Sequence, residues 1–209
     1  MKNNKKELFS FFANATIVFM ELIGVILSLK RRGVGAFLFY TENVNYFTLL
    51  VSLWFVLEYL IKQKTSKIVN CFRFISSVCL AVTFVMVTTI LIPMFPESFM
   101  FMMFEDSNLY QHFLCPTISI LSLILFENKN KLHKTNIIFA LIPTLVYGIV
   151  MVTLNLLKVI AGPYPFFYLY QIRWYLSIPW LIGVLLIVVA IDLFVFWLHN
   201  KKFLSKKIK

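Results

Sequence analysis

The stretch FISSVCLAVTFVMVTTILIPMF, residues 74–95, decides the fold class because it is long, strongly apolar and free of charged side chains. An α-helix needs about 20 predominantly apolar residues to cross the hydrocarbon core of a bilayer. Five further stretches qualify, at residues 11–29, 45–61, 109–126, 137–157 and 178–198. The sequence therefore predicts an all-α polytopic integral membrane protein, in which residues 1–209 form a single transmembrane domain, a bundle of six transmembrane helices.

The composition of the whole chain agrees with this prediction. Its 209 residues are 60% hydrophobic and 14% charged, and their mean hydropathy is +0.84. A soluble domain is nearer a quarter charged, and a chain of this length cannot bury so much apolar surface in an aqueous core. These numbers exclude a soluble enzyme and a nucleic-acid-binding module, so we expect membrane lipids as partners and no nucleic acid. Cys71, Cys79 and Cys115 show neither metal-ligand spacing nor a disulfide framework.

The positive charge of the chain sets its predicted orientation. The net charge is +11, and the Lys and Arg residues form short clusters between the apolar stretches. Short cytoplasmic connections of membrane proteins are enriched in Lys and Arg. If the termini share a side with the connections after the second and fourth helices, that side carries fifteen basic residues, among them Arg73 in the connection after the second helix. The opposite side carries five, namely Lys30, Arg31, Arg32, Lys158 and Arg173. We therefore predict that both termini are cytoplasmic, with Lys30-Arg31-Arg32 as the one cluster that opposes the trend.

Three distinctive polar or turn-forming motifs fall on the predicted outer side. Thr41 and Asn45 lie four residues apart at the start of the second helix, so they share one helix face. His112 lies in the first turn of the fourth helix, and Tyr164 lies in the motif Gly-Pro-Tyr-Pro-Phe-Phe, residues 162–167, of the last connection. Because the helices form one bundle, the topology predicts that these motifs lie within reach of one another.

The residue types at these positions suit nucleophilic catalysis. A Thr hydroxyl becomes a nucleophile when a neighbouring base removes its proton, and His is the usual base near neutral pH. We predict Thr41 as the nucleophile and His112 as the base or proton relay, acting on an ester or amide carbonyl of a hydrophobic substrate, with no cofactor and no metal. Asn45 would orient the pair or donate to the developing oxyanion. Two structural alternatives stay open: Thr41 as a helix N-cap, and His112 as an interfacial anchor to lipid headgroups.

The same three motifs carry a resemblance to a known family. Tyr-Thr-x-x-x-Asn, His-x-x-x-Pro and Gly-x-Tyr-Pro-Phe occur here in the order and at the spacing of the androgen-induced / androgen-dependent family of multi-spanning membrane proteins, and the chain resembles its bacterial branch. Animal members are intramembrane threonine hydrolases that cleave fatty acid esters of hydroxy fatty acids. The resemblance implies the catalytic roles for Thr41 and His112 and a bacterial plasma membrane as the location. Val44 departs from the bacterial Thr-x-x-Ser-Asn pattern, and Thr48 offers a second match to the threonine motif.

Two acidic residues lie within the predicted spans. Glu21 lies near the middle of the first span and Asp192 lies in the sixth, and neither span contains a Lys or Arg partner. Charged residues inside a membrane are costly and commonly mark ion or proton pathways. Glu21 is therefore a candidate supporting residue of the site, together with Asn45 and Tyr164. Two alternative functions stay open: a proton-coupled small-solute transporter that uses both carboxylates, and a non-enzymatic membrane protein whose polar groups lock helices together.

Overall fold

The computed structural model describes residues 2–127, 131–170 and 174–204. Within them, six helical spans are long and apolar enough to cross a membrane, which confirms the predicted all-α fold with six transmembrane helices. The main helices are α1 (Lys2–Arg32), α2 (Tyr40–Lys62), α3 (Lys67–Met86), α7 (Cys115–Leu125), α8 (Thr135–Leu156) and α9 (Trp174–Leu204). Short helices complete the connections: η1 (Gly33–Leu38), η2 (Val87–Leu91), α4 (Ile92–Met94), η3 (Pro96–Ser98), α5 (Phe99–Phe104), α6 (Asp106–Asn108), η4 (Leu109–Leu114) and η5 (Pro165–Phe167).

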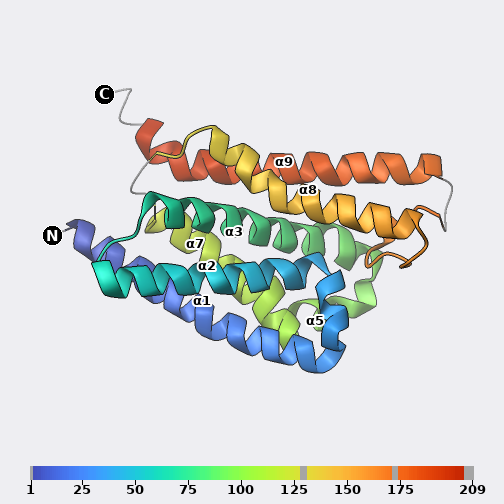
Figure 1. Ribbon diagram of the computed structural model, residues 1–209, viewed down its shortest axis with the longest axis horizontal. Helices are drawn as coiled ribbons and strands as arrows, with labels where there is room; N and C mark the ends of the chain where they lie inside the picture. Colours follow the sequence, from blue (N-terminus) through green and yellow to red (C-terminus); the bar gives the residue numbers. More distant parts are fainter. Residues whose placement is uncertain (1, 128–130, 171–173, 205–209) are drawn as a thin grey trace.

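Successive spans run in opposite directions, so the N-terminal end of α1 and the C-terminal end of α9 lie at the same end of the bundle (Figure 1). We call this the terminal end. The opposite end, which holds η1, α5 and the connection between α8 and α9, is the far end. The assignment of the terminal end to the cytoplasm remains a prediction from charge. Among the basic residues behind that prediction, five lie outside the described residues: Lys129, Arg173, Lys206, Lys207 and Lys209.

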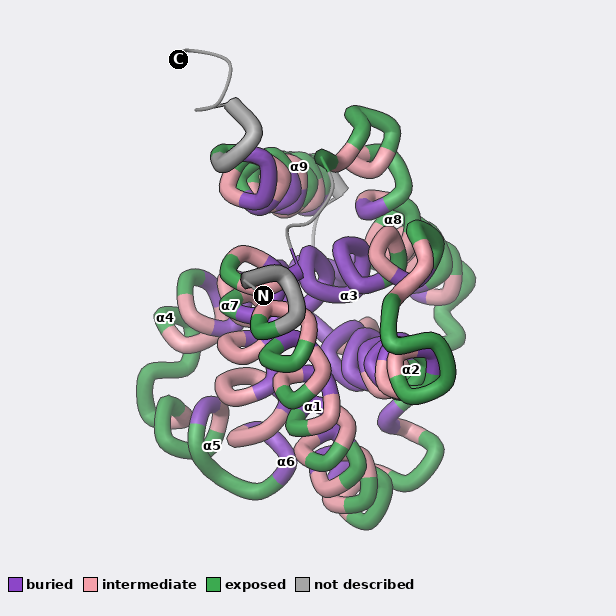
Figure 2. The backbone as a smooth tube through the Cα atoms, turned by 90° about the vertical axis from the view of Figure 1, so that its left-hand side faces the viewer, coloured by how far each residue is buried: buried purple, intermediate pink, exposed green. Residues whose placement is uncertain are grey.

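Helix α3 lies at the centre of the bundle (Figure 2). It packs against α2 and α7 on one side and against α8 and α9 on the other. Every residue from Arg73 to Thr83 is buried, so over these turns burial extends around the whole helix. A helix that is hydrophobic all round is a buried helix, which explains the apolar residues on every face of residues 74–95. By contrast, large side chains of α9 such as Leu186 are exposed, as lipid-facing side chains are.

Two turns of π-helix interrupt the spans, and a proline follows each one. η2 ends two residues before Pro93, and η4 ends two residues before Pro116. Proline has no N–H group, and its ring collides with the carbonyl four residues earlier. A π turn widens the helix and relieves this conflict, and such turns occur frequently at functional sites. η4 carries Gln111 and His112 at the far end.

A buried ion pair binds four helices together at the terminal end. Helix α3 begins earlier than the predicted span, so Arg73 lies inside the helix and is completely buried instead of lying in the preceding loop. Its Nη2 atom lies 3.2 Å from Oε1 of Glu127, to which Asn14 of α1 also donates a hydrogen bond. Serine hydroxyls from α2, α3 and α7 accept further hydrogen bonds from the guanidinium: Ser52, Ser76 and Ser119. Arg73 therefore stabilises the fold and is not one of the loop charges that orient the chain.

We expect Arg73→Met to lower the free energy of unfolding by about 3–5 kcal/mol, because it leaves the Glu127 carboxylate buried without a counter-ion. Lys62 provides the control, since its exposed ammonium lies 2.9 Å from Glu58. Lys62→Met should cost less than about 1 kcal/mol. Unfolding by heat and by denaturant in detergent micelles measures both variants. Equal losses in the two would contradict the structural role assigned to Arg73.

Candidate functional site

The structure brings the start of α2 into contact with the connection between α8 and α9. Thr41 is the second residue of α2, and Tyr164 immediately precedes η5. The Tyr164 hydroxyl lies 3.4 Å from Thr41 Oγ1 and 3.5 Å from the Thr41 backbone nitrogen. Phe39 is the N-cap of α2, so Thr41 does not fill the capping position that we considered for it. Two of the three sequence motifs therefore meet at the far end through a pair of hydroxyl groups.

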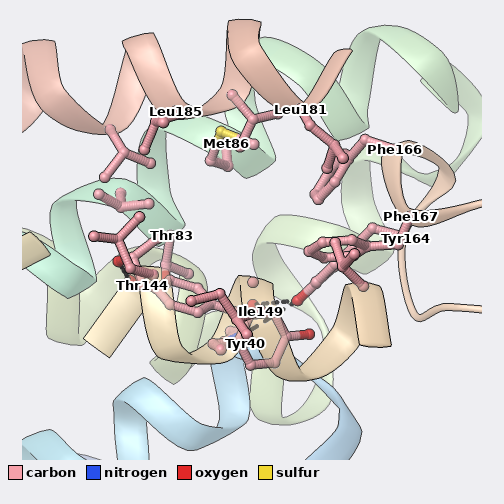
Figure 3. Close-up of a pocket in the computed structure, with 18 of the residues that line it drawn as sticks. Tyr40, Thr83, Met86, Thr144, Ile149, Tyr164, Phe166, Phe167, Leu181 and Leu185 are labelled. Carbon is pink, nitrogen blue, oxygen red and sulfur yellow. Dashed lines mark hydrogen bonds between the residues drawn. The ribbon is translucent and has the colours of Figure 1, made fainter. Parts of the chain in front are cut away.

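Thr41 and Tyr164 lie at the edge of a cavity of about 330 Å³. The cavity lies between α2, α3, α8 and α9, and most of its wall is apolar. In Figure 3, Leu181 and Leu185 of α9 line the wall opposite Tyr40. A concave, mainly apolar pocket with a few polar groups at one place is the usual form of a small-molecule site. The apolar lining suits a hydrocarbon chain.

The other hydroxyl groups around the cavity already have partners. Thr83, Tyr147 and Thr153 donate to backbone carbonyls, and Tyr40 shares a 2.7 Å hydrogen bond with Thr144. A hydroxyl whose proton is bound to a carbonyl is poorly placed to react. The pair formed by the Thr41 and Tyr164 hydroxyls is longer and weaker, so it is the more easily opened by a ligand.

Burial raises the pKa of Tyr164, although its contacts with Thr41 oppose the effect. The phenol therefore stays protonated at neutral pH and can donate a hydrogen bond. Because the Thr41 N–H donates to the Tyr164 oxygen, the Tyr164 O–H is free to donate to Thr41 Oγ1. In that arrangement the Thr41 proton points away from Tyr164 and is available to a base.

His112 lies on η4, and its ring is held by α5. Its Nδ1 atom is hydrogen-bonded to the backbone carbonyl of Met102. A carbonyl oxygen only accepts hydrogen bonds, so Nδ1 carries the proton, and the neutral ring keeps a basic lone pair on Nε2. His112 does not line the cavity, and no hydrogen bond between the described residues joins it to Thr41. The structure thus brings Thr41 to Tyr164 and does not bring it into direct contact with His112.

Asn45 fixes the start of α2 to η4. Its side-chain nitrogen donates to the backbone oxygen of Thr41 at 2.7 Å and to that of Gln111 at 3.4 Å. Both of its N–H groups are used in this way, so Asn45 positions Thr41 and has no donor left for an oxyanion. Gln111 in turn donates to Glu42 at 2.6 Å. The sequence reasoning passed over Gln111, although an amide inside a predicted span was a usable signal.

Two of the three residues in the basic cluster that opposed the orientation trend, Arg31 and Arg32, are ion-paired at the far end. Arg31 and Arg32 each lie 3.9 Å from the buried carboxylate of Glu42, and Arg31 also lies 3.3 Å from Asp106. The Arg32 guanidinium stacks 3.9 Å from the centre of the Phe39 ring. These two charges are neutralised within the protein, so they contribute little to the charge of the outer connection.

The two carboxylates of the predicted spans lie on helices with different neighbours. Glu21 is completely buried on α1, which packs against α2 and α7, and the Cys115 thiol faces it. Asp192 is completely buried on α9, which packs against α8 and α3, and Cys79 lies close to it. Helix packing therefore does not bring the carboxyl groups of Glu21 and Asp192 together. Among the described residues, no group of three His, Cys, Asp or Glu side chains is arranged to hold a metal ion.

By helix length and hydropathy, the chain is a multi-pass membrane protein in contact with lipid. No protein-family model, curated protein or solved structure matches it. The polar groups of the far end and the apolar cavity beside them are the features of the structure that bear on function.

The conformation of the 162–167 motif gives a test of the site. Gly162 has φ +94°, and a Cβ atom there would lie 3.0 Å from Phe167 Cβ. We expect Gly162→Ala to cost about 1–3 kcal/mol in stability, because the residue is strained and its neighbours must move. Gly148→Ala is the control: it adds a Cβ to open space on α8 and should be neutral or slightly stabilising. Thermal unfolding measures the stability of both variants against that of the wild type. A Gly162→Ala variant as stable as the wild type would contradict the placement of Tyr164.

Proposed function

We propose that the protein is an intramembrane hydrolase that cleaves an ester-linked lipid or fatty acyl substrate. One observation carries the proposal: the Thr41 hydroxyl, held by Tyr164, lies at the edge of an apolar cavity of about 330 Å³ among membrane-spanning helices. The cavity suits an acyl chain, and the hydroxyl pair marks where its ester carbonyl would lie. The motif resemblance to the androgen-induced / androgen-dependent family, carried by Thr41, His112 and Tyr164, supports the same reaction.

In the proposed reaction Thr41 Oγ1 attacks the ester carbonyl carbon while its proton passes to Nε2 of His112. The tetrahedral intermediate collapses, the bond from the carbonyl carbon to the alcohol oxygen breaks, and the departing alcohol takes the proton from His112. Water then attacks the acyl group on Thr41, again giving a proton to His112, which returns it to Thr41 as the fatty acid leaves. The cycle consumes one water and needs no cofactor.

The geometry gives each remaining residue a role in the proposal. Tyr164 orients the Thr41 hydroxyl, and Asn45 fixes the turn of α2 that carries it. Because Thr41 and His112 share no hydrogen bond, we assign the proton transfer to a bridging water, through which a general base can act. The Met102 carbonyl keeps His112 in the tautomer that can accept that proton.

A fluorophosphonate probe, which reacts with activated hydroxyl groups, tests the assignment in purified protein. We expect Thr41→Ala to abolish labelling and His112→Ala to slow it by about 10²–10⁴-fold. Tyr164→Phe should slow it by roughly tenfold, the effect of one hydrogen bond. Thr89→Ala removes an exposed hydroxyl away from the cavity and is the control. Labelling that survives in Thr41→Ala and disappears in Thr48→Ala would move the nucleophile to Thr48, and labelling that survives both would refute the proposal.

The cavity wall predicts chain-length selectivity. Leu181→Trp fills the space between α9 and Tyr40, so we expect it to reduce hydrolysis of long-chain p-nitrophenyl esters far more than that of the acetate. Leu186→Trp places the same ring on the exposed face of α9 and should leave the ratio of the two rates at the wild-type value. A ratio that changes equally in both variants would show that the acyl chain does not occupy this cavity.

A further inference from the structure

The helices on the other side of α3 enclose a set of buried polar side chains, of which the proposed hydrolase uses Asn45 to hold Thr41. On α1 the set repeats every seven residues, at Asn14, Glu21 and Ser28. On α2 it comprises Asn45, Thr48 and Ser52, which share one face. All six side chains are completely buried. Residues at these spacings lie on the same side of a helix, so both helices turn a polar face toward the interior of the bundle.

Glu21 is the residue in this set that most needs a partner. Among the described residues, no nitrogen or oxygen atom is hydrogen-bonded to its carboxylate oxygens and no basic side chain forms an ion pair with it; the Cys115 thiol, a weak donor, faces it. The buried arginine Arg73 is already paired with Glu127, and Arg31 and Arg32 are paired with Glu42. A buried carboxylate without compensation is strongly destabilising, so a positive charge or a proton has to accompany Glu21.

The elements that pack against α1, namely α2 and η4, offer further oxygen atoms. The side-chain oxygens of Asn45, Thr48 and Gln111 are also buried and lack hydrogen-bond partners. Contacts bring these residues to one level: Gly24, one turn after Glu21, lies against the Gln111 side chain, and Asn45 reaches the Gln111 backbone. Thr48 follows Asn45 by one turn of α2.

The unused atoms are mainly acceptors. The side-chain nitrogens of Asn45 and Gln111 already donate hydrogen bonds to carbonyl and carboxylate oxygens. The Oδ1 atom of Asn45 and the Oε1 atom of Gln111 remain without a hydrogen-bond partner. A proton on Glu21 would satisfy one acceptor, whereas a hard cation is coordinated by several oxygens at once. A single positive charge neutralises the carboxylate, and a divalent ion would leave an excess charge in the bilayer interior.

From this geometry we propose that Glu21, with Asn45, Thr48 and Gln111, forms an intramembrane binding site for a small monovalent cation such as sodium. Gln111 lies on the π turn η4, and its side chain contacts Gly24 of α1 and donates to Glu42 of α2. Ionisable side chains inside membrane bundles mark ion and proton pathways, and the coupling ions of transporters bind near the bilayer midplane. The four residues of the site do not line the acyl cavity, and Asn45 is the residue that the site shares with the proposed hydrolase, so a measurement of ion-dependent stability tests the site separately from hydrolysis.

Thermal unfolding of the detergent-purified protein in NaCl and in choline chloride of equal ionic strength tests the proposal. We expect NaCl to raise Tm of the wild type saturably, by roughly 5 °C at about one hundred times Kd. Glu21→Gln should abolish the rise. Asp192→Asn, which neutralises another completely buried carboxyl on α9, is the matched control and should keep it. A wild-type Tm that is equal in the two salts, or a rise that persists in Glu21→Gln, would refute the site.

Thr48→Val gives a second test that does not alter the buried charge, since it replaces one hydroxyl by a methyl group of similar size. We expect the sodium concentration at half-maximal effect to rise at least about tenfold, a loss of affinity typical of one buried polar contact. An unchanged half-maximal concentration would contradict coordination by Thr48. A Tm that responds to pH and not to sodium would assign the counter-charge to a proton and overturn the proposal.

Discussion

The hydrocarbon core of a membrane offers no water to a polar group, so every such group that enters it has to find its partner inside the protein. This constraint acts most strongly around α3, the buried central helix (Figure 2). Arg73 can occupy its first turns only because Glu127 and three serine hydroxyls surround the guanidinium, and Asn14 donates to the same Glu127 carboxylate. The same constraint draws Arg31 and Arg32 back against Glu42 at the far end. A network of paired charges therefore joins the helices at each end of the bundle.

Between these networks α3 separates two interiors of different character. On the side of α1, α2 and α7, small polar side chains face one another around Glu21. On the side of α8 and α9, the interior is an apolar cavity with hydroxyl groups at its edge. Helix α2 contributes to both, because Thr41 reaches the cavity while Asn45, one turn later, reaches η4. One short polar segment therefore links the proposed catalytic site with the proposed cation site.

Sequence reasoning located the spans well because membrane thickness and hydrophobicity act on each helix separately. It also grouped the motifs of Thr41 and Tyr164 at one end, since the alternating direction of the helices determines the end at which each connection lies. It misplaced Arg73 in a loop, because a cation in a span is expected only if its partner is known. Glu127 is 54 residues away in the sequence, and no local pattern joins the two.

The sequence by itself determined that the chain is an all-α membrane protein with six spans, because that result depends on composition over successive stretches of about 20 residues. Tertiary structure alone decided which polar groups meet. It paired Thr41 with Tyr164, tied His112 to Met102, and brought Gln111 against Asn45 of α2 and Gly24 of α1. The physical reason is that these contacts depend on the rotation of each helix about its axis and on the π turns before Pro93 and Pro116, and packing against α3 sets that rotation.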